Sequence, residues 1–430
     1  MDNQITLEVL QKEVASAVAI RRAVRLQPAG GIGDKIFPPT YEGGQYALEQ
    51  RVIAGTRRPC VLLDSVQSQA NRMELALLDA HRAGRIVLPL VEVDFPTSGM
   101  PEVGVVTSLE APHRLADAIL RDSMRDGRKF RDSEEGRMLD SATLANASGI
   151  FGLCPTALVF GLWDSTGPRG GLGIKFQRAV VSELVGVDIE GGTRPSSRID
   201  PLNIQLNAGP VFRNAEGLPT LDPDKALKTN GKPVLFGKKK DGDKLKDVVF
   251  EPSANAKIPD EGRPSKANHG NVTPSLINHD TKKPHHGGVT LAYALQTTVI
   301  SLPALRRLHF PVDGVISQET DAAAHAALAA LALCGAALAI DQGCDLRSRC
   351  LLVPEAGQFV TWEIVRPDGS TEPFTLSAAE VCELLNKAVA AAKAKGLSWR
   401  EEPLTLAPSE GLAAMVRKSR ELAMQTTAEG

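Results

Sequence analysis

Residues 161–178 read GLWDSTGPRGGLGIKFQR and run directly into the apolar stretch Ala179–Ile189. This order predicts a tight glycine-rich loop that feeds a β-strand. Glycine has no Cβ, so the backbone N–H groups of such a loop can approach an anion closely. Arg169, Lys175 and Arg178 add positive charge there. Taken alone, the stretch is either a solvent-exposed β-hairpin or an anion-binding loop.

A second glycine-rich loop strengthens the anion-binding interpretation. It spans Gln27–Tyr41, reads QPAGGIGDKIFPPTY and carries Lys35. Residues 14–26 before it form a predicted strand with three arginines at its far end, Arg21, Arg22 and Arg25. Basic side chains therefore accompany both loops.

The next element is a short strand at Val61–Leu63 followed by a predicted helix. Asp64 and Gln67 have the spacing of a capping box, so we expect Asp64 to begin the helix. Ser68, Asn71 and Arg72 then share one face near its start. These side chains are either an anion- or ribose-phosphate-binding surface, or polar groups that satisfy neighbouring loops.

The composition sets limits on class and location. The chain has 430 residues, of which 43% are apolar and 4% aromatic, and its net charge is −2. One large or two smaller domains are expected, and overall charge does not indicate a nucleic-acid-binding protein. The six cysteines are scattered and the N-terminus is too polar for a secretion signal, which predicts reduced thiols and a cytoplasmic protein. The alanine-rich run 322–340 is expected to be a buried helix rather than a membrane span.

The order of predicted elements indicates an α+β fold. Further strands are expected at 85–95, 288–302 and 350–353, a hairpin around 367–369, and helices over 107–120, 320–342 and 377–395. Residues 201–288 are basic and rich in proline and glycine, and Lys238, Lys239 and Lys240 suggest a hairpin tip. Strand, helix, strand, insertion, strand, helix, strand is the βαββαβ order of a ferredoxin-like or RNA-recognition-motif fold. We therefore expect a palm formed by residues 1–200 and 289–430, with 201–288 as an insertion.

Several chemistries are disfavoured. The glycine loop has neither the phosphate-loop nor the dinucleotide-binding spacing. His269, His279, His285 and His286, with Asp280, are irregularly spaced for a metal site. No nucleophile motif is present, and nothing brings Asp64, Asp164 or Asp188 together for acid–base work.

Because the paired aromatics of RNA-recognition motifs are missing, base stacking is not the expected main mode of RNA binding. Basic glycine-rich loops suggest instead that a nucleic-acid backbone is held without base reading.

Four separated stretches resemble one known family. They are AIRRAVRLQPAGGIGDKIFPPTY (19–41), VLLDSVQSQANRME (61–74), TSLEAPHRLADA (107–118) and FGLWDSTGPRGGLGIKFQR (160–178). In this order they are similar to the backbone subunit of type I-G (formerly I-U) CRISPR surveillance complexes, a Cas-seven-type member of the RAMP superfamily. The resemblance extends over residues 15–395.

This resemblance implies a modified RNA-recognition-motif palm with inserted finger and thumb elements. It also implies copies that assemble head to tail along a CRISPR RNA whose bases pair with target DNA. Family partners are a fused processing-and-capping subunit, a large subunit and a separate helicase-nuclease. No cofactor, metal or membrane is expected. An alternative is a ribonuclease that cuts target RNA with a loop aspartate, Asp34. The candidate RNA-binding residues are Arg21, Arg22, Arg25, Lys35, Ser68, Asn71, Arg72, His113, Arg114, Arg169, Lys175, Arg178, Lys238, Lys239 and Lys240.

Overall fold

The computed structural model describes residues 5–164, 174–242, 244–251, 257–277, 287–356 and 361–428. The chain forms two compact units. Unit 1 comprises Met1–Gly191 and Gly288–Met415, and unit 2 comprises Gly192–Gly287 and Val416–Gly430. Helix α10 (Glu410–Ala428) begins in unit 1, and its residues from Val416 onward belong to unit 2.

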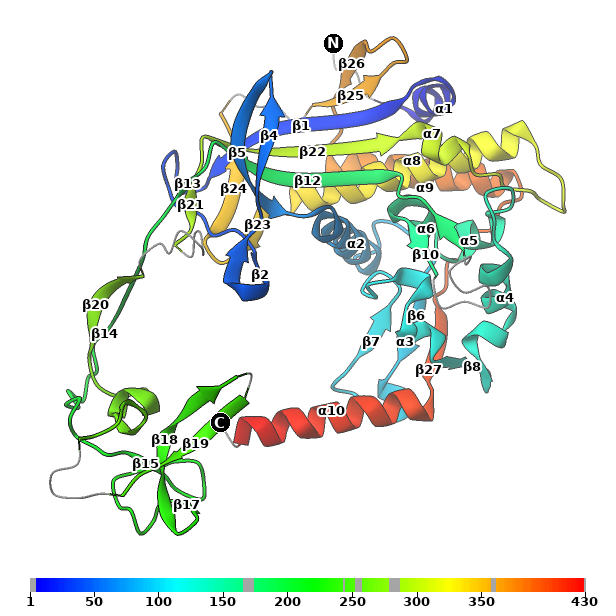
Figure 1. Ribbon diagram of the computed structural model, residues 1–430. Helices are drawn as coiled ribbons and strands as arrows, with labels where there is room; N and C mark the ends of the chain where they lie inside the picture. The colour runs from blue at the N-terminus through cyan, green and yellow to red at the C-terminus, as the bar shows by residue number, and fades with distance from the viewer. Residues whose placement is uncertain are drawn as a thin grey trace. The chain divides into compact units, whose positions relative to one another are not determined.

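The core of unit 1 is a curled antiparallel sheet (Figure 1). Its strand order is β23-β24-β1-β22-β12-β5-β4, and β25 also pairs with β1 and with β26. The strands are β1 (Ala19–Pro28), β4 (Leu48–Ile53), β5 (Thr56–Asp64), β12 (Val180–Val187), β22 (Tyr293–Ser301), β23 (Cys344–Arg347), β24 (Cys350–Pro354), β25 (Trp362–Val365) and β26 (Thr371–Phe374).

The central strands have ferredoxin-like topology. Helix α2 (Val66–Arg82) lies between β1 and β12 in the chain, and α8 (Gln318–Asp341) lies between β22 and β24. The order β24-β1-β22-β12, with every neighbouring pair antiparallel, is that of a βαββαβ unit. The predicted α+β class is confirmed, and the sheet is compatible with an RNA-recognition-motif-like palm.

Helices cover one face of this sheet. Residues of β1 alternate between buried and more exposed positions, as expected for a sheet covered on one side. Helix α2 packs on β12 and α8 packs on β22, while α1 (Leu7–Ser16), α2 and α9 (Ala378–Ala394) also contact α8 (Figure 1). Helix α8 is long and apolar enough to cross a membrane, yet 89% of its apolar window is buried. The prediction of a buried core helix is confirmed.

A second, five-stranded sheet of unit 1 has the order β7-β6-β27-β8-β9, in which β27 pairs with β6 in parallel. Its strands are β6 (Val91–Asp94), β7 (Val105–Thr107), β8 (Ser123–Arg125), β9 (Arg128–Lys129) and β27 (Leu404–Pro408). The short helices α3 (Ala118–Arg121), α4 (Glu134–Ser141), α5 (Ser148–Leu153), α6 (Thr156–Phe160) and α7 (Leu302–Arg306) complete the unit. The predicted strand 85–95 is thus reduced to β6, and it pairs with the distant strand β27 rather than with the palm.

Unit 2 contains β strands joined by loops. Strand β14 (Arg194–Arg198) pairs with β20 (Val272–Ile277), and a five-stranded sheet has the order β16-β15-β18-β17 with β19 paired to β18. Its strands are β15 (Phe212–Arg213), β16 (Pro219–Thr220), β17 (Lys228–Thr229), β18 (Lys232–Asp241) and β19 (Lys244–Val249). Lys238, Lys239 and Lys240 lie near the end of β18, which confirms the predicted basic hairpin.

Several predicted boundaries were wrong. Helix α1 extends through Ser16, so the arginines of β1 lie along the strand rather than at its far end. Residues 107–120 do not form one helix, because Arg114 has a positive φ of 51°. A short 3₁₀ turn at Arg114–Ala116 precedes α3 instead, and the Asp117 carboxylate caps α3 through the Ile119 N–H.

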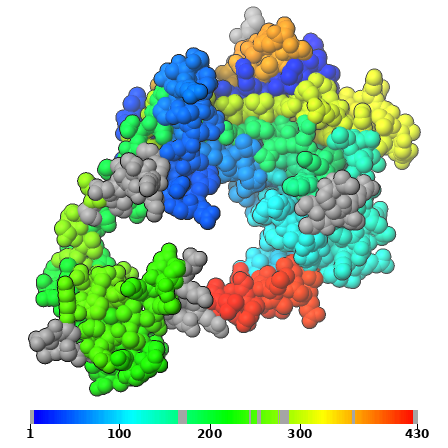
Figure 2. All heavy atoms as spheres, viewed as in Figure 1, coloured from blue at the N-terminus to red at the C-terminus, as the bar shows by residue number. Residues whose placement is uncertain are grey.

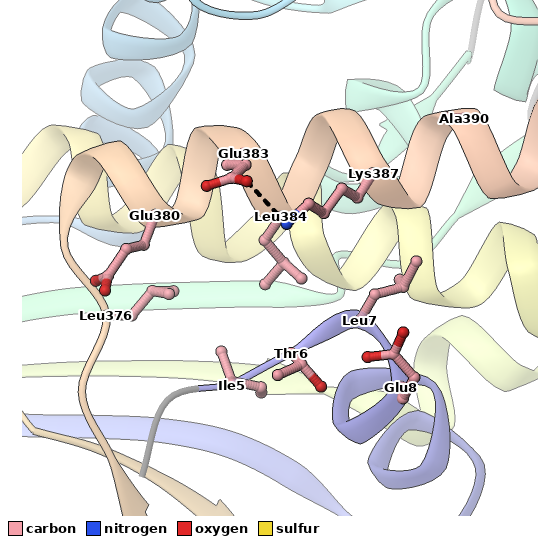
Figure 3. Close-up of a pocket in the computed structure, with 10 residues that line it drawn as sticks. All are labelled: Ile5, Thr6, Leu7, Glu8, Leu376, Glu380, Glu383, Leu384, Lys387 and Ala390. Carbon is pink, nitrogen blue, oxygen red and sulfur yellow. Dashed lines mark ion pairs between the residues drawn. The ribbon is translucent and has the colours of Figure 1, made fainter. Parts of the chain in front are cut away.

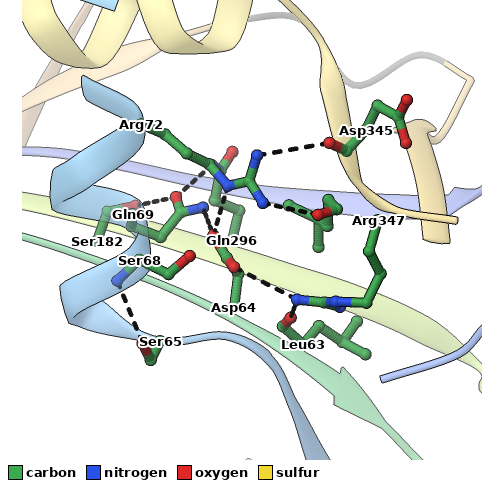
Figure 4. Close-up of polar contacts among 11 residues, drawn as sticks. Leu63, Asp64, Ser65, Ser68, Gln69, Arg72, Ser182, Gln296, Asp345 and Arg347 are labelled. Carbon is green, nitrogen blue, oxygen red and sulfur yellow. Dashed lines mark hydrogen bonds and ion pairs between the residues drawn. The ribbon is translucent and has the colours of Figure 1, made fainter. Parts of the chain in front are cut away.

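Asp64 does not begin helix α2. It ends β5, and Ser65 is the N-cap, accepting a hydrogen bond from the Ser68 N–H at 3.2 Å (Figure 4). The buried Asp64 carboxylate instead accepts from Gln69 and Arg72. Helix α9 does have a capping box, formed by Ser377 and Glu380, as its predicted start requires.

Candidate nucleic-acid interface

A hollow of about 610 Å³ in unit 1, called the basic groove below, brings together three of the stretches that stood out in the sequence. Gln67 comes from the first turn of α2, and residues 112–114 come from the turn before α3. The base of the glycine-rich hairpin completes it, with β10 (Leu162–Trp163) paired to β11 (Lys175–Phe176). The lining residues are Gln67, Pro112, His113, Arg114, Phe160, Gly161, Leu162, Trp163, Lys175, Phe176, Gln177 and Arg178.

Arg178 is the central cation of the basic groove. Its Nε donates to the Phe160 carbonyl at 3.1 Å and its Nη2 to Gln67 Oε1 at 3.2 Å. Neither partner is a carboxylate, and Arg178 forms no ion pair with a described residue. Partial burial and the nearby Arg114 guanidinium lower the pKa of Arg178 from its usual value. A bound anion would relieve this uncompensated charge.

The backbone of Arg178 explains why residue 161 is a glycine. Gly161 has φ of 88°, a conformation that favours glycine. A Cβ at this position would lie 3.2 Å from the backbone nitrogen of Arg178. The chain can therefore pass between α6 and the hairpin only with glycine here.

Trp163 and Lys175 form the other side of the basic groove. They face each other across the β10–β11 pair, and Lys175 Nζ lies 5.9 Å from the centre of the Trp163 ring. Trp163 is 61% exposed, which is unusual for a side chain of this size. An exposed indole beside two cations can stack on a base of any sequence while the cations hold phosphates. Sequence reasoning missed Trp163, although it lies within the quoted motif.

Arg114, one of the predicted RNA-binding residues, is partnered within the protein. Its side chain is buried and forms a bidentate ion pair with Glu74, while its Nη1 donates to the Gly161 carbonyl at 3.1 Å. Burial raises the pKa of Glu74 even beside this guanidinium. All three nitrogens of the Arg114 guanidinium therefore donate within the protein, and one of them holds the Gly161 carbonyl. His113 beside it is exposed at the rim.

The polar face of α2 is divided between the basic groove and the core. Gln67 lines the groove, and the exposed Asn71 accepts from its Nε2 at 3.2 Å; Asn71 itself and Ser68, in the first turn, do not line it. Arg72, another predicted RNA-binding residue, is also partnered within the protein. Its Nε binds Asp64, and its other nitrogens donate to the carbonyls of Asp345 and Leu346 (Figure 4). Arg72 therefore joins α2 to β23.

The arginines of β1 have different surroundings. Arg22, also a predicted RNA-binding residue, is only 2% exposed and lies within the covered face of the sheet. Arg21 and Arg25 lie on the opposite face, where Arg21 binds Glu363 and Arg25 lies over the Tyr293 ring at 4.2 Å. Lys35 is half-buried in the second glycine-rich loop. None of these four residues lines the basic groove.

The remaining predicted residues lie elsewhere. Lys238, Lys239 and Lys240 are exposed on β18 of unit 2. Register pairs Lys239 with Lys246, two like charges on adjacent strands. Arg169 lies outside the described residues, as do Asp280 and three of the four clustered histidines, whereas His269 borders an apolar hollow of unit 2.

The basic surface extends beyond the groove. A smaller hollow of about 210 Å³ shares Lys175, Phe176 and Gln177 with it. Arg307 lines this hollow and donates to Gln177 Oε1 at 2.8 Å. The exposed hairpin of β4 and β5, the blue hairpin in Figure 2, carries further arginines, of which Arg51 and Arg58 pair with acidic neighbours.

Another large hollow suits nucleic acid poorly. It measures about 560 Å³ and lies between the start of α1 and α9 (Figure 3). Its charged lining consists of Glu8, Glu380, Glu383 and Lys387, with Lys387 paired to Glu383 at 2.8 Å. Net negative charge would repel a phosphate backbone.

Catalytic alternatives find little support in the described residues. No group of three or more His, Cys, Asp or Glu side chains among them could hold a metal ion. Asp64 and Asp164 are buried and pair with Arg72 and Arg131, while Asp188 pairs with Arg58. All six cysteines are free thiols. Asp34 is exposed, and its Oδ1 accepts from the Lys35 N–H at 2.8 Å.

Residues 20–191 match the family model described as CRISPR-associated protein GSU0053 (Cas_GSU0053). The match indicates a CRISPR-associated protein family. It spans nearly all of β1, both glycine-rich stretches, α2 and all the residues that line the basic groove. No curated protein matches the chain. The match over residues 20–191 supports the predicted CRISPR-associated family and is consistent with a Cas-seven-type subunit of a surveillance complex.

Proposed function

We propose that this protein is a non-catalytic subunit that binds CRISPR RNA through its backbone, independently of sequence. The observation that carries the proposal is the basic groove, where Arg178 and Lys175 flank the exposed Trp163. Neither cation forms an ion pair with a described residue. A subunit that accepts any guide sequence must bind phosphate and sugar, and stacking on one indole tolerates every base.

The proposal extends to assembly. Copies of the chain would line up head to tail on one guide RNA and form the backbone of a cytoplasmic type I surveillance complex. The guide would pair with target DNA, and the processing-and-capping and large subunits would complete the complex. Repeated head-to-tail contact uses two different faces of each copy and builds a helix rather than a closed dimer. The family match and the four motif stretches support this assembly.

A salt titration tests RNA binding. Full-length protein, freed of nucleic acid, is titrated into two unrelated single-stranded RNAs at several salt concentrations, and binding is followed by fluorescence anisotropy. We expect similar affinities for both RNAs and a steep loss of affinity with salt. The slope of log K against log[salt] is negative, and each lost phosphate contact makes it less steep by about 0.7 for a single strand. Lys175→Gln and Arg178→Gln should therefore each flatten the slope by about that amount.

Lys393→Gln is the matched control, since Lys393 is exposed and pairs with Glu401 away from the basic groove. It should leave both affinity and slope unchanged. A strong preference for one RNA, or an affinity indifferent to salt, would contradict the proposal.

The ribonuclease alternative has its own assay. The assembled complex is incubated with guide-complementary RNA and a divalent cation, and the RNA is analysed on a denaturing gel. We expect intact RNA. Regularly spaced cuts that disappear with Asp34→Ala would replace the non-catalytic proposal by RNA-guided cleavage.

A further inference from the structure

A line of buried polar side chains runs through unit 1 from β1 to the end of β5. Arg22 Nη1 donates to Gln296 Oε1 at 2.9 Å. Gln296 Nε2 donates to Gln69 Oε1 at 3.0 Å, and Gln69 Nε2 donates to Asp64 Oδ2 at 2.6 Å. Figure 4 shows the α2 end of this line. The two amides thus separate the Arg22 guanidinium from the nearest carboxylate of the line.

Positive charge exceeds negative charge in this network. Asp64 also binds Arg72 Nε at 2.9 Å, and Arg347 Nη2 lies 3.6 Å from its other oxygen. Among the described members of the network, Arg72 and Arg347 contact the one carboxylate, and Arg22 contacts none. The network holds two more positive than negative charges, and of its three guanidinium groups only Arg22 is fully buried, since the Arg72 and Arg347 side chains are 35% and 26% exposed.

Arg22 carries the least compensated of these charges. It is 2% exposed, and its Nε finds no acceptor among the described residues. Burial lowers the pKa of Arg22 to about 10. A buried cation without a counter-ion is strongly unfavourable, so Arg22 requires a partner that the described residues do not supply.

A cavity lies where that partner is needed. It has a volume of about 140 Å³, and Arg22, Arg72, Gln69 and Gln296 line it together with apolar side chains such as Leu352. No carboxylate occurs among the described residues of its lining. This volume is large enough for a small ligand such as a tetrahedral oxyanion. It shares no lining residue with the basic groove.

We propose that this cavity binds a free tetrahedral oxyanion of the size of phosphate. Arg22 Nε donates to the anion, Arg72 adds charge at its other side, and the surplus of two positive charges matches a divalent phosphate. The anion neutralises the buried Arg22 guanidinium and so stabilises the contact among β1, β22 and α2, which all contribute residues to the cavity. This site does not depend on the proposed RNA binding.

The test is stabilisation by inorganic phosphate. Full-length protein without nucleic acid is unfolded with urea in sodium phosphate and in sodium chloride of equal ionic strength. A ligand at ten times its dissociation constant raises the ratio of folded to unfolded protein about elevenfold. We expect an increase of this kind in phosphate, and equal stability in both salts would overturn the proposal.

Three variants make the test specific. Arg22→Met should abolish the phosphate effect, whereas Arg21→Met, on the opposite face of β1, should retain it. Gln296→Glu places a carboxylate where Oε1 now accepts from Arg22, so it should also abolish the effect and serves if Arg22→Met fails to fold. A phosphate effect that survives both Arg22→Met and Gln296→Glu would overturn the proposal. So would an Arg22→Met protein whose RNA affinity falls in phosphate-free buffer, because the cavity would then serve RNA.

Discussion

Glu74 and Arg114 form a bidentate ion pair in the interior of unit 1, with Arg114 Nε and Nη2 lying 2.5 and 2.8 Å from the two carboxylate oxygens. Removing one partner leaves the other charge buried and unpaired. Arg114→Met should therefore lower the free energy of unfolding by about 3–5 kcal/mol, measured by urea denaturation. The double variant Arg114→Met/Glu74→Leu should recover much of this loss.

The exposed pair of Lys387 with Glu383 provides the comparison. Lys387→Ala should cost less than about 1 kcal/mol. If Arg114→Met lowers the free energy of unfolding no more than Lys387→Ala does, the buried Glu74–Arg114 pair does not support the basic groove from inside.

Trp163 should contribute stacking without charge. Trp163→Ala should weaken RNA binding by about 1–3 kcal/mol, and Trp163→Phe should retain most of the affinity. Because no cation is removed, the slope of log K against log[salt] should stay that of the unaltered protein, unlike the slope of Lys175→Gln. Anisotropy titrations at several salt concentrations measure both quantities. Unchanged affinity in Trp163→Ala would remove stacking from the proposed mode of binding.

Gly161→Ala should damage both stability and RNA binding. The variant combines a positive φ with a contact of the new Cβ against the Arg178 backbone, and we expect a loss of about 2–3 kcal/mol in unfolding free energy. Displacement of Arg178 should lower RNA affinity as well. Gly84→Ala is the control, since Gly84 has φ of 69° but open space around its Cβ position. It should cost about 1–2 kcal/mol and leave RNA affinity intact.

Asp200 should make unit 2 sensitive to acid. Its carboxylate accepts from the Gly270 and Leu202 N–H groups at 2.5 and 3.0 Å, and these bonds lower its pKa. Such a carboxylate stabilises the folded state above its unfolded pKa of about 3.9, and this stability is lost as pH falls through the lower folded pKa. Protection of the Gly270 amide from hydrogen exchange should therefore decrease below about pH 4.

Asp200→Asn removes this titration. Its Gly270 amide should be less protected at neutral pH and should change little between pH 5 and 3. Asp224→Asn, at an exposed carboxylate, should behave like the unaltered protein. If protection of the Gly270 amide depended on pH in the same way in Asp200→Asn and in the unaltered protein, another group would control the acid sensitivity of this region.

The sequence by itself determined the α+β fold class and the order of the strands and helices in the palm. Periodicity and capping residues predicted α8, α9 and the strand at Ala179–Ile189, because these signals arise within one segment. The glycine-rich stretches and their cations also marked the base of the β10–β11 hairpin and Arg178. The same local signals misassigned residues 107–120, where a left-handed backbone at Arg114 interrupts an otherwise helical pattern.

Only the tertiary structure decided which basic side chains remain available to bind a ligand. Arg22, Arg72 and Arg114 have the same chemistry as Arg178 in the sequence, yet Arg114 finds a carboxylate 40 residues away and Arg72 binds carbonyls about 273 residues away. Arg22 faces a cavity behind the sheet, whereas Trp163 remains exposed beside Lys175. The reason is physical: the free energy of a charge depends on the partners and solvent around it, and distant segments supply both only after the chain has folded.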